Sequence, residues 1–187
     1  PGGCAIGARP INLHTKALGQ LGAIIAQKHG YVEAQAPNGL RGRTVRFERI
    51  TVTGTEDIMM AAVLAKGETT LENAALEPEV VDLANLLQKM GALISGAGTP
   101  KIRIQGVPRL GGARHSIIAD RIEAGTFLLA GLAAGQGLTV TGIDATHLEA
   151  VVEKMRQAGA KISYPKKDAV RAEVGNTLRA VDIATQE

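Results

Sequence analysis

Leu21-Gly22-Ala23-Ile24-Ile25 introduces a pattern that returns as Met90-Gly91-Ala92-Leu93-Ile94 and again as Ala158-Gly159-Ala160-Lys161-Ile162. The glycines of successive copies are 69 and 68 residues apart, and the second offset also aligns residues 62–95 with residues 130–163 without a gap. Such an internal repeat predicts tandem structural units. Solenoid units are shorter, roughly 20 to 50 residues, so we expect each repeat to be a small subdomain of a larger protein.

Hydrophobic periodicity on either side of the pattern predicts an α/β unit. Apolar residues recur at helical spacing just before each copy, in residues 12–21, 79–90 and 147–158. Alternating stretches after each copy predict strands at residues 31–35, 101–105 and 169–174. Further strands are expected at residues 44–52, 69–72, 114–118 and 137–141, with helices at residues 56–66 and 122–134. Pro37-Asn38-Gly39 predicts a tight hairpin turn after residues 31–35.

The composition limits the classes of function. Only four of the 187 residues are aromatic, so the core must be aliphatic. No apolar run reaches the roughly 18 to 20 residues of a membrane span, and the single cysteine excludes an intramolecular disulfide framework. Together with the lack of a signal peptide pattern, this favours a reducing cytoplasm. The net charge of +3 comes from interspersed charges, which suits small anionic ligands. We therefore expect no nucleic-acid partner and no membrane partner.

The only cysteine lies in the segment Pro1-Gly2-Gly3-Cys4-Ala5-Ile6-Gly7-Ala8-Arg9-Pro10. This segment is too rich in glycine and proline for a helix or a regular strand. A thiol near a guanidinium has a lowered pKa and can act as a nucleophile or proton donor. The alternative is that Cys4 is an ordinary buried apolar residue. The loop alone leaves both possibilities open.

This loop, followed by Leu13-His14, resembles the catalytic loop of the UDP-N-acetylglucosamine enolpyruvyl transferase family. Glu72-Asn73-Ala74-Ala75, the following Glu77-Pro78-Glu79-Val80-Val81-Asp82 and residues 120–127 resemble the same family. The resemblance implies inside-out α/β barrel subdomains, three in each of two domains. Residues 1–118 would then end the first domain, with a partial subdomain at about 1–43 and a full one at about 44–118. Residues 119–187 would be the first subdomain of the second domain.

The resemblance also implies a reaction. The family transfers the enolpyruvyl group of phosphoenolpyruvate to the 3-hydroxyl of UDP-N-acetylglucosamine by addition and elimination, without a metal or cofactor. This is the first committed step of peptidoglycan synthesis, and so serves cell-wall biogenesis, cell shape and cell division. Cys4 matches the cysteine that donates a proton to the methylene carbon, carries a covalent phospholactoyl adduct and is alkylated by fosfomycin.

Two segments match the substrate-binding segments of the family. The first comprises Arg9, Pro10, Ile11, Asn12 and Leu13, and the second comprises Arg49, Ile50, Thr51 and Val52. The family usually has aspartate in place of Asn12 and more often glycine in place of Thr53. Thr53-Gly54-Thr55-Glu56 also has the pattern of a capping box, and the free N–H groups of a helix N-terminus suit a diphosphate. The alternative is that both segments are simple helix starts.

Glu77 and Asp120 are candidates for the cleft of the family enzyme, although both are also explained as helix-start acids. The four histidines show no metal-ligand spacing, so we assign no metal site. Three other classes remain: a non-catalytic binding or assembly module, a nucleic-acid-binding repeat protein, and the sister transferase acting on shikimate phosphate. The sister family lacks the cysteine loop. The remaining phosphoenolpyruvate-binding and base residues of the family match no position in this chain, so we expect the chain to need the remainder of the same enzyme and to be inactive alone.

Overall fold

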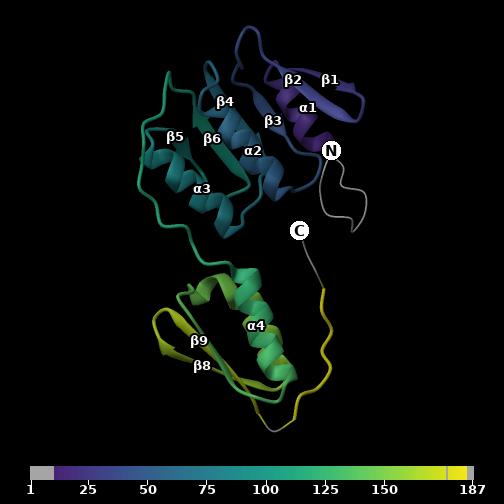
Figure 1. Cartoon of the computed structure of the whole chain (residues 1–187), viewed down its shortest axis with the longest axis vertical. Coiled ribbons are helices and arrows are strands. Elements are labelled where there is room, and N and C mark those ends of the chain that lie inside the picture. Colours follow the sequence, from purple (N-terminus) through teal and green to yellow (C-terminus); the bar gives the residue numbers. More distant parts are fainter. Residues whose placement is uncertain (1–10, 176, 185–187) are drawn as a thin grey trace. The chain divides into compact units, whose positions relative to one another are not determined.

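The structure, a computed structural model, describes residues 11–175 and 177–184 (Figure 1). It divides into two compact units between Ser116 and Ile117. Each unit has its own cluster of buried apolar side chains, built almost entirely from Leu, Ile, Val, Ala and Met. Among the described residues, no helix combines the length and apolar character needed to cross a membrane.

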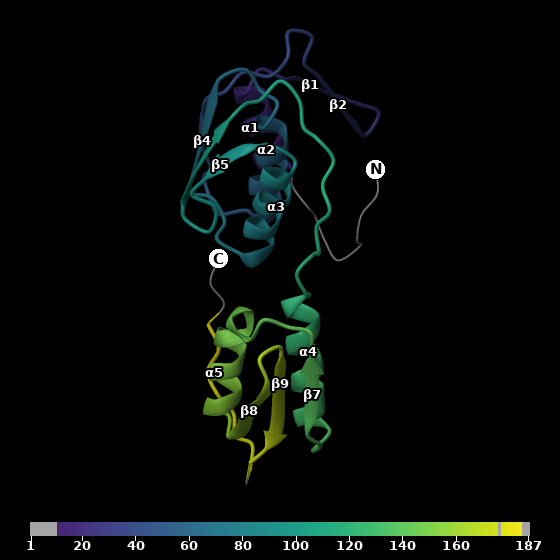
Figure 2. The ribbon, with the colours of Figure 1, turned by 90° about the vertical axis from the view of Figure 1, so that its left-hand side faces the viewer.

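The described residues of the first unit form three helices and six strands. Its elements are α1 (Asn12–Gln20), β1 (Ile24–Lys28), β2 (Tyr31–Gln35), β3 (Thr44–Arg46), α2 (Val52–Ala62), β4 (Glu68–Glu72), α3 (Pro78–Lys89), β5 (Leu93–Ser95) and β6 (Lys101–Gln105). Strands β1 and β2 form an antiparallel hairpin, and the other four form a sheet in the order β3-β4-β6-β5. Among the described strands of this sheet, β3 and β4 pair in parallel, and the other neighbours pair antiparallel. Figure 2 shows α1, α2 and α3 on one side of this sheet.

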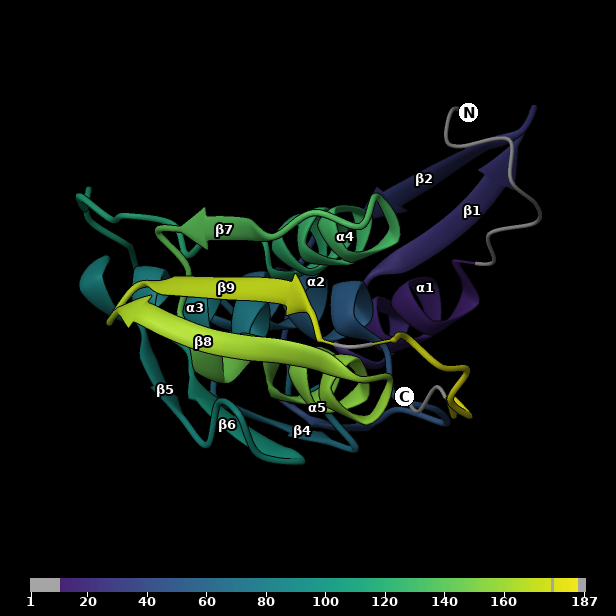
Figure 3. The same cartoon turned by 90° about the horizontal axis from the view of Figure 1, so that it is seen from below.

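The second unit repeats most of this arrangement. Its elements are α4 (Arg121–Ala133), β7 (Leu138–Thr141), the 3-10 helix η1 (Ala145–Leu148), α5 (Glu149–Gln157), β8 (Ala160–Lys166) and β9 (Ala169–Val174). Its strands form an antiparallel sheet in the order β7-β9-β8, side by side in Figure 3. Helix α4 packs on β7 and β9, and α5 packs on β8. The order β7-β9-β8 matches β4-β6-β5 of the first unit, which confirms the repeat.

The repeated glycine has a structural explanation. Gly22, Gly91 and Gly159 follow the last residues of α1, α3 and α5, and all three have φ of 101°. After α1, the amide N–H of Gly22 bonds the Gly19 carbonyl at 3.0 Å, and that of Ala23 bonds the Leu18 carbonyl at 3.0 Å. This left-handed termination satisfies the last helical carbonyls and favours glycine, which lacks the Cβ that would clash. The pattern therefore marks the point where the chain leaves each helix and enters the β-hairpin that follows.

Most predicted elements are confirmed, and β2, β6 and β9 match the predicted bounds. The predicted strand at residues 44–52 was too long: β3 ends at Arg46, and α2 begins at Val52 instead of Glu56. The predicted strand at residues 114–118 was wrong, because this stretch has no regular secondary structure. Residues 37–39 do form a tight turn, in which the Gly39 amide donates to the Ala36 carbonyl at 2.9 Å, but this turn does not join a hairpin. The hairpin turn lies between β1 and β2, where His29 and Gly30 have positive φ. The strands β1, β5 and β8 were missed, and all three begin inside the repeated pattern itself.

Candidate functional site

The candidate nucleophile and two neighbouring candidates lie outside the described residues; these are Cys4, Arg9 and Pro10. The structure does describe the other predicted substrate-binding positions. Ile11, Asn12 and Leu13 begin α1, and Arg49 to Val52 lead into α2. Both segments belong to the first unit.

In the part of the chain that the structure describes, no side chain caps the start of α1. Ile11 occupies the N-cap position and makes no capping hydrogen bond through its side chain. Ile11 and Asn12 are exposed, whereas Leu13 is buried at 8% exposure, so its side chain serves the core. The Thr15 hydroxyl donates to the carbonyl oxygens of Ile11 and Asn12 at 3.2 Å each, which holds this first turn in place.

The start of α2 is capped by Thr51. Its Oγ1 accepts a hydrogen bond from the Gly54 amide at 3.2 Å, so the predicted capping box at Thr53 was wrong by two residues. The buried hydroxyl of Thr55 donates to the Thr51 carbonyl at 2.7 Å and accepts from the Ala75 amide at 3.1 Å. This chain of hydrogen bonds fixes the α2 start against the loop that follows β4. Arg49 is exposed, and Ile50, Thr51 and Val52 are half-buried.

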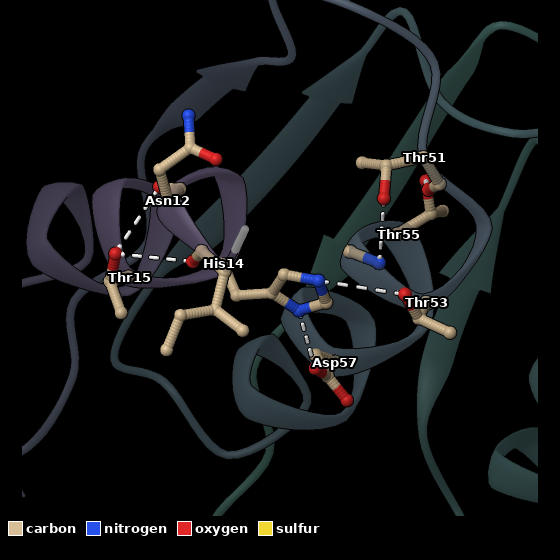
Figure 4. Close-up of polar contacts among 9 residues, drawn as sticks. Asn12, His14, Thr15, Thr51, Thr53, Thr55 and Asp57 are labelled. Carbon is tan, nitrogen blue, oxygen red and sulfur yellow. Dashed lines mark hydrogen bonds and ion pairs between the residues drawn. The ribbon is translucent and has the colours of Figure 1, made fainter. Parts of the chain in front are cut away.

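The two predicted segments are neighbours in space. Helix α1 packs against α2, and Figure 4 shows the His14 side chain extending from α1 to the first turns of α2. His14 Nδ1 lies 2.6 Å from Asp57 Oδ2, and His14 Nε2 lies 3.5 Å from Thr53 Oγ1. Lys16 of α1 also forms an ion pair with Glu48, just before Arg49. Sequence reasoning missed these contacts, because the paired residues lie more than thirty positions apart and no periodicity links them.

Acidic side chains gather beside this site. Glu77 precedes α3, and its Oε2 is buried with no hydrogen-bond partner among the described residues. Burial raises the pKa of Glu56, and the negative charges of Glu79, Asp57 and Glu77 raise this pKa further. The site therefore joins an acidic side to two helix N-termini, whose partial positive charge favours an anionic ligand.

Asp120 belongs to the second unit, where it caps α4. Its Oδ1 accepts hydrogen bonds from the amides of Ile122 at 2.8 Å and Glu123 at 3.0 Å. The helix-cap interpretation of Asp120 is thus confirmed, and its contact with a ligand stays a prediction. Within residues 11–175 and 177–184, no three His, Cys, Asp or Glu side chains are arranged to hold a metal ion.

Comparison with known families matches residues 1–187 to the model described as EPSP synthase (3-phosphoshikimate 1-carboxyvinyltransferase). The UDP-N-acetylglucosamine 1-carboxyvinyltransferase of Solibacter usitatus is 66% identical over the whole chain, which covers 45% of that protein. The enzyme of the same name from Acidobacterium capsulatum is 58% identical, and the chain covers 43% of it. The chain thus spans less than half the length of these curated relatives.

Solved structures agree on the fold. The enolpyruvyl transferase NikO from Streptomyces tendae aligns with 90% of the chain and 43% of its own, with a TM-score of 0.78 and 24% identity. An EPSP synthase from Acinetobacter baumannii aligns with 94% of the chain and 42% of its own, with a TM-score of 0.68 and 21% identity. The predicted fold class, α/β repeats of the enolpyruvyl transferase type, is confirmed.

Proposed function

Because the chain belongs to the EPSP synthase (3-phosphoshikimate 1-carboxyvinyltransferase) family, we propose that it forms part of a carboxyvinyl transferase acting on UDP-N-acetylglucosamine and phosphoenolpyruvate. The choice of nucleotide sugar over shikimate phosphate is supported by the 66% identity to a relative with that printed name. The geometric observation that carries the proposal is the pairing of the α1 and α2 starts. Two segments expected to bind the same substrate lie side by side although their sequences are far apart.

In the proposed reaction, the 3-hydroxyl oxygen of the sugar adds to C2 of phosphoenolpyruvate and gives up its proton to a base in the remainder of the enzyme, while Cys4 donates a proton to C3. The tetrahedral adduct then loses a proton from C3 and expels phosphate from C2, which restores the double bond in the transferred enolpyruvyl group. The arginine side chain of Arg9 is assigned to the phosphate or carboxylate, since a guanidinium pairs with either through two hydrogen bonds.

The proposed substrate segment from Arg9 through Pro10, Ile11 and Asn12 to Leu13 presents one helix N-terminus to the nucleotide sugar. The second helix N-terminus, that of α2, is presented by Arg49, Ile50, Thr51 and Val52. The exposed Arg49 and the partial positive charge of this helix start suit a diphosphate. Glu77 and Asp120 are proposed to line the cleft. The proposal places the enzyme in the cytoplasm, in peptidoglycan synthesis, with the remainder of the same enzyme supplying the other substrate-binding residues.

The test measures phosphate release by a full-length enzyme, as long as the curated relatives, that contains this chain. We expect release that requires both phosphoenolpyruvate and UDP-N-acetylglucosamine, and none when shikimate 3-phosphate replaces the sugar. Intact-mass analysis after incubation with fosfomycin and UDP-N-acetylglucosamine should show one adduct, absent from Cys4→Ser. Turnover with shikimate 3-phosphate but not with UDP-N-acetylglucosamine, each tested with phosphoenolpyruvate, would overturn the choice of substrate. Retention of the adduct in Cys4→Ser would overturn the assignment of the thiol.

A further inference from the structure

His14 is held at both ring nitrogens. Its Nδ1 lies 2.6 Å from Asp57 Oδ2, and its Nε2 lies 3.5 Å from Thr53 Oγ1. The His14 side chain is 21% exposed and that of Asp57 is 49% exposed, so the pair is partly shielded from water. Figure 4 shows the imidazole lying across the gap between the two helices.

The proton positions follow from the chemistry of the partners. An ionised carboxylate can only accept, so His14 Nδ1 carries the proton and donates it to Asp57. In the neutral ring, Nε2 is then an acceptor, and the Thr53 hydroxyl donates to it. Asp57 therefore sets both the tautomer and the orientation of the ring, as carboxylates do for histidines in many sites.

The three residues connect the two segments assigned to the substrate. His14 directly follows Leu13 at the start of α1, and Thr53 directly follows Val52 at the start of α2. Asp57 lies one turn further along α2, where the Thr51 cap and the Thr55 hydrogen bonds anchor the helix. A shift of either helix start would break at least one of the His14 contacts.

We propose that His14, oriented by Asp57, is a positioning residue that sets the spacing between the two helix starts for the nucleotide sugar. This inference rests on the proposed function. Binding to a preformed site avoids the cost of ordering it, so the contribution should appear in the affinity for the nucleotide sugar. His14 is given no role in the proton transfers, which belong to other groups.

The structure supplies a matched control. Lys16 and Glu48 also link α1 to the segment before α2, but their side chains are 57% and 62% exposed. Exposed ion pairs contribute little because water and salt screen them. Lys16→Gln should therefore leave the kinetic constants unchanged.

The experiment compares His14→Ala, Asp57→Ala, His14→Asn and Lys16→Gln in the enzyme of the relatives' length. We expect the first two to raise KM for UDP-N-acetylglucosamine roughly ten-fold, with kcat and the KM for phosphoenolpyruvate within about two-fold of wild type. The double variant His14→Ala/Asp57→Ala should be no worse than either single variant, because the two residues act as one unit. His14→Asn, which can still donate to Asp57, should recover part of the affinity.

Thermal melts of each variant separate a folding defect from a positioning defect. An unchanged KM in His14→Ala and Asp57→Ala would overturn the inference, and so would an equal effect in Lys16→Gln. A fall in kcat with unchanged KM would assign His14 to the chemistry and also overturn it. If the wild-type enzyme shows no turnover with UDP-N-acetylglucosamine, the proposed function fails and this inference with it. If the wild-type enzyme turns over normally and the variants are unaffected, the inference about His14 fails but the proposed function stands.

Discussion

The carboxyl group of Glu56, beside the candidate site, makes the stability of the fold depend on pH. Burial, followed by the charges of Glu79, Asp57 and Glu77, raises its pKa above the ordinary value of 4.5. Between the ordinary and the raised pKa, the folded chain binds more protons than the unfolded chain. Stability therefore falls as pH rises through this window, and the full penalty is present above the raised pKa.

Glu56→Gln removes the charge and so should make the first unit more stable than wild type near neutral pH. The gain should disappear below the ordinary glutamate pKa of 4.5, where the wild-type carboxyl is protonated in both states. Urea unfolding at the two pH values measures both differences. Glu149→Gln, at an exposed first-turn position of α5, is the control and should show no comparable pH-dependent gain. A gain of equal size at both pH values would show that charge is not the cause.

Sequence reasoning at the residue scale found positions by motif but not their contacts. Threonine is a common N-cap residue, so the sequence allows either Thr51 or Thr53 to cap α2. The hydrogen bonds of Thr55 with Thr51 and Ala75 favour Thr51 as the cap. Those bonds need β4 and α2 to be packed together. The His14–Asp57 contact likewise joins residues 43 positions apart, so only the packing of α1 on α2 reveals it.

At the scale of elements, alanine in place of the glycine after each helix should cost stability, by an amount that depends on the space around the glycine. Gly91 and Gly159 both have φ of 101°, but an added Cβ at Gly91 meets nothing within 4 Å, whereas at Gly159 it comes within 2.7 Å of the Thr177 carbonyl oxygen. Gly91→Ala should cost about 1 to 2 kcal/mol from backbone strain alone. Gly159→Ala should cost more, because the clash with backbone adds to the strain.

Native-state hydrogen exchange measures these costs in each unit separately. Gly112→Ala is the control, since Gly112 has open space around it and no positive φ. It should be close to neutral. Equal costs for Gly91→Ala and Gly159→Ala would contradict the assigned clash. No cost at Gly91 would contradict the account of the repeated pattern.

In β6 the periodicity of the sequence and the observed burial agree. Ile102 and Ile104 of β6 are fully buried between exposed neighbours, so alternation alone located the strand. Residues 114–118 do not alternate in burial, since His115 and Ile118 are half-buried and the other three residues are exposed. The His115 side chain contacts Asp82 of α3 instead of lying in a strand. The predicted strand at residues 44–52 was too long: β3 occupies only its start, and the Thr51 cap already begins α2 at its end. An alternating pattern predicts which side chains are buried, but the segment forms a strand only where a neighbouring strand supplies backbone hydrogen bonds.

At the scale of the whole molecule, each unit buries its own core. The first cluster lies within residues 17–104 and the second within residues 124–172. The segment between them, residues 106–120, has no regular secondary structure. Backbone hydrogen bonds hold it at Gly106, Val107 and Gly111. Separate cores predict that a cut in this segment leaves both units folded.

Limited trypsin digestion should therefore cut first after the exposed Arg114, beyond the backbone hydrogen bonds that protect Arg109. The side chain of the next residue, His115, is only 8% exposed: its Nε2 lies 2.8 Å from Asp82 Oδ1, and its Nδ1 lies 3.0 Å from Lys89 Nζ. Because these contacts hold the segment on α3, His115→Ala should speed this cut several-fold without lowering the melting temperature of the second unit. Mass spectrometry identifies the cut, and circular dichroism follows the melting of the separated products. A first cut inside a helix, or a product that melts without a cooperative transition, would show that the two cores are not independent.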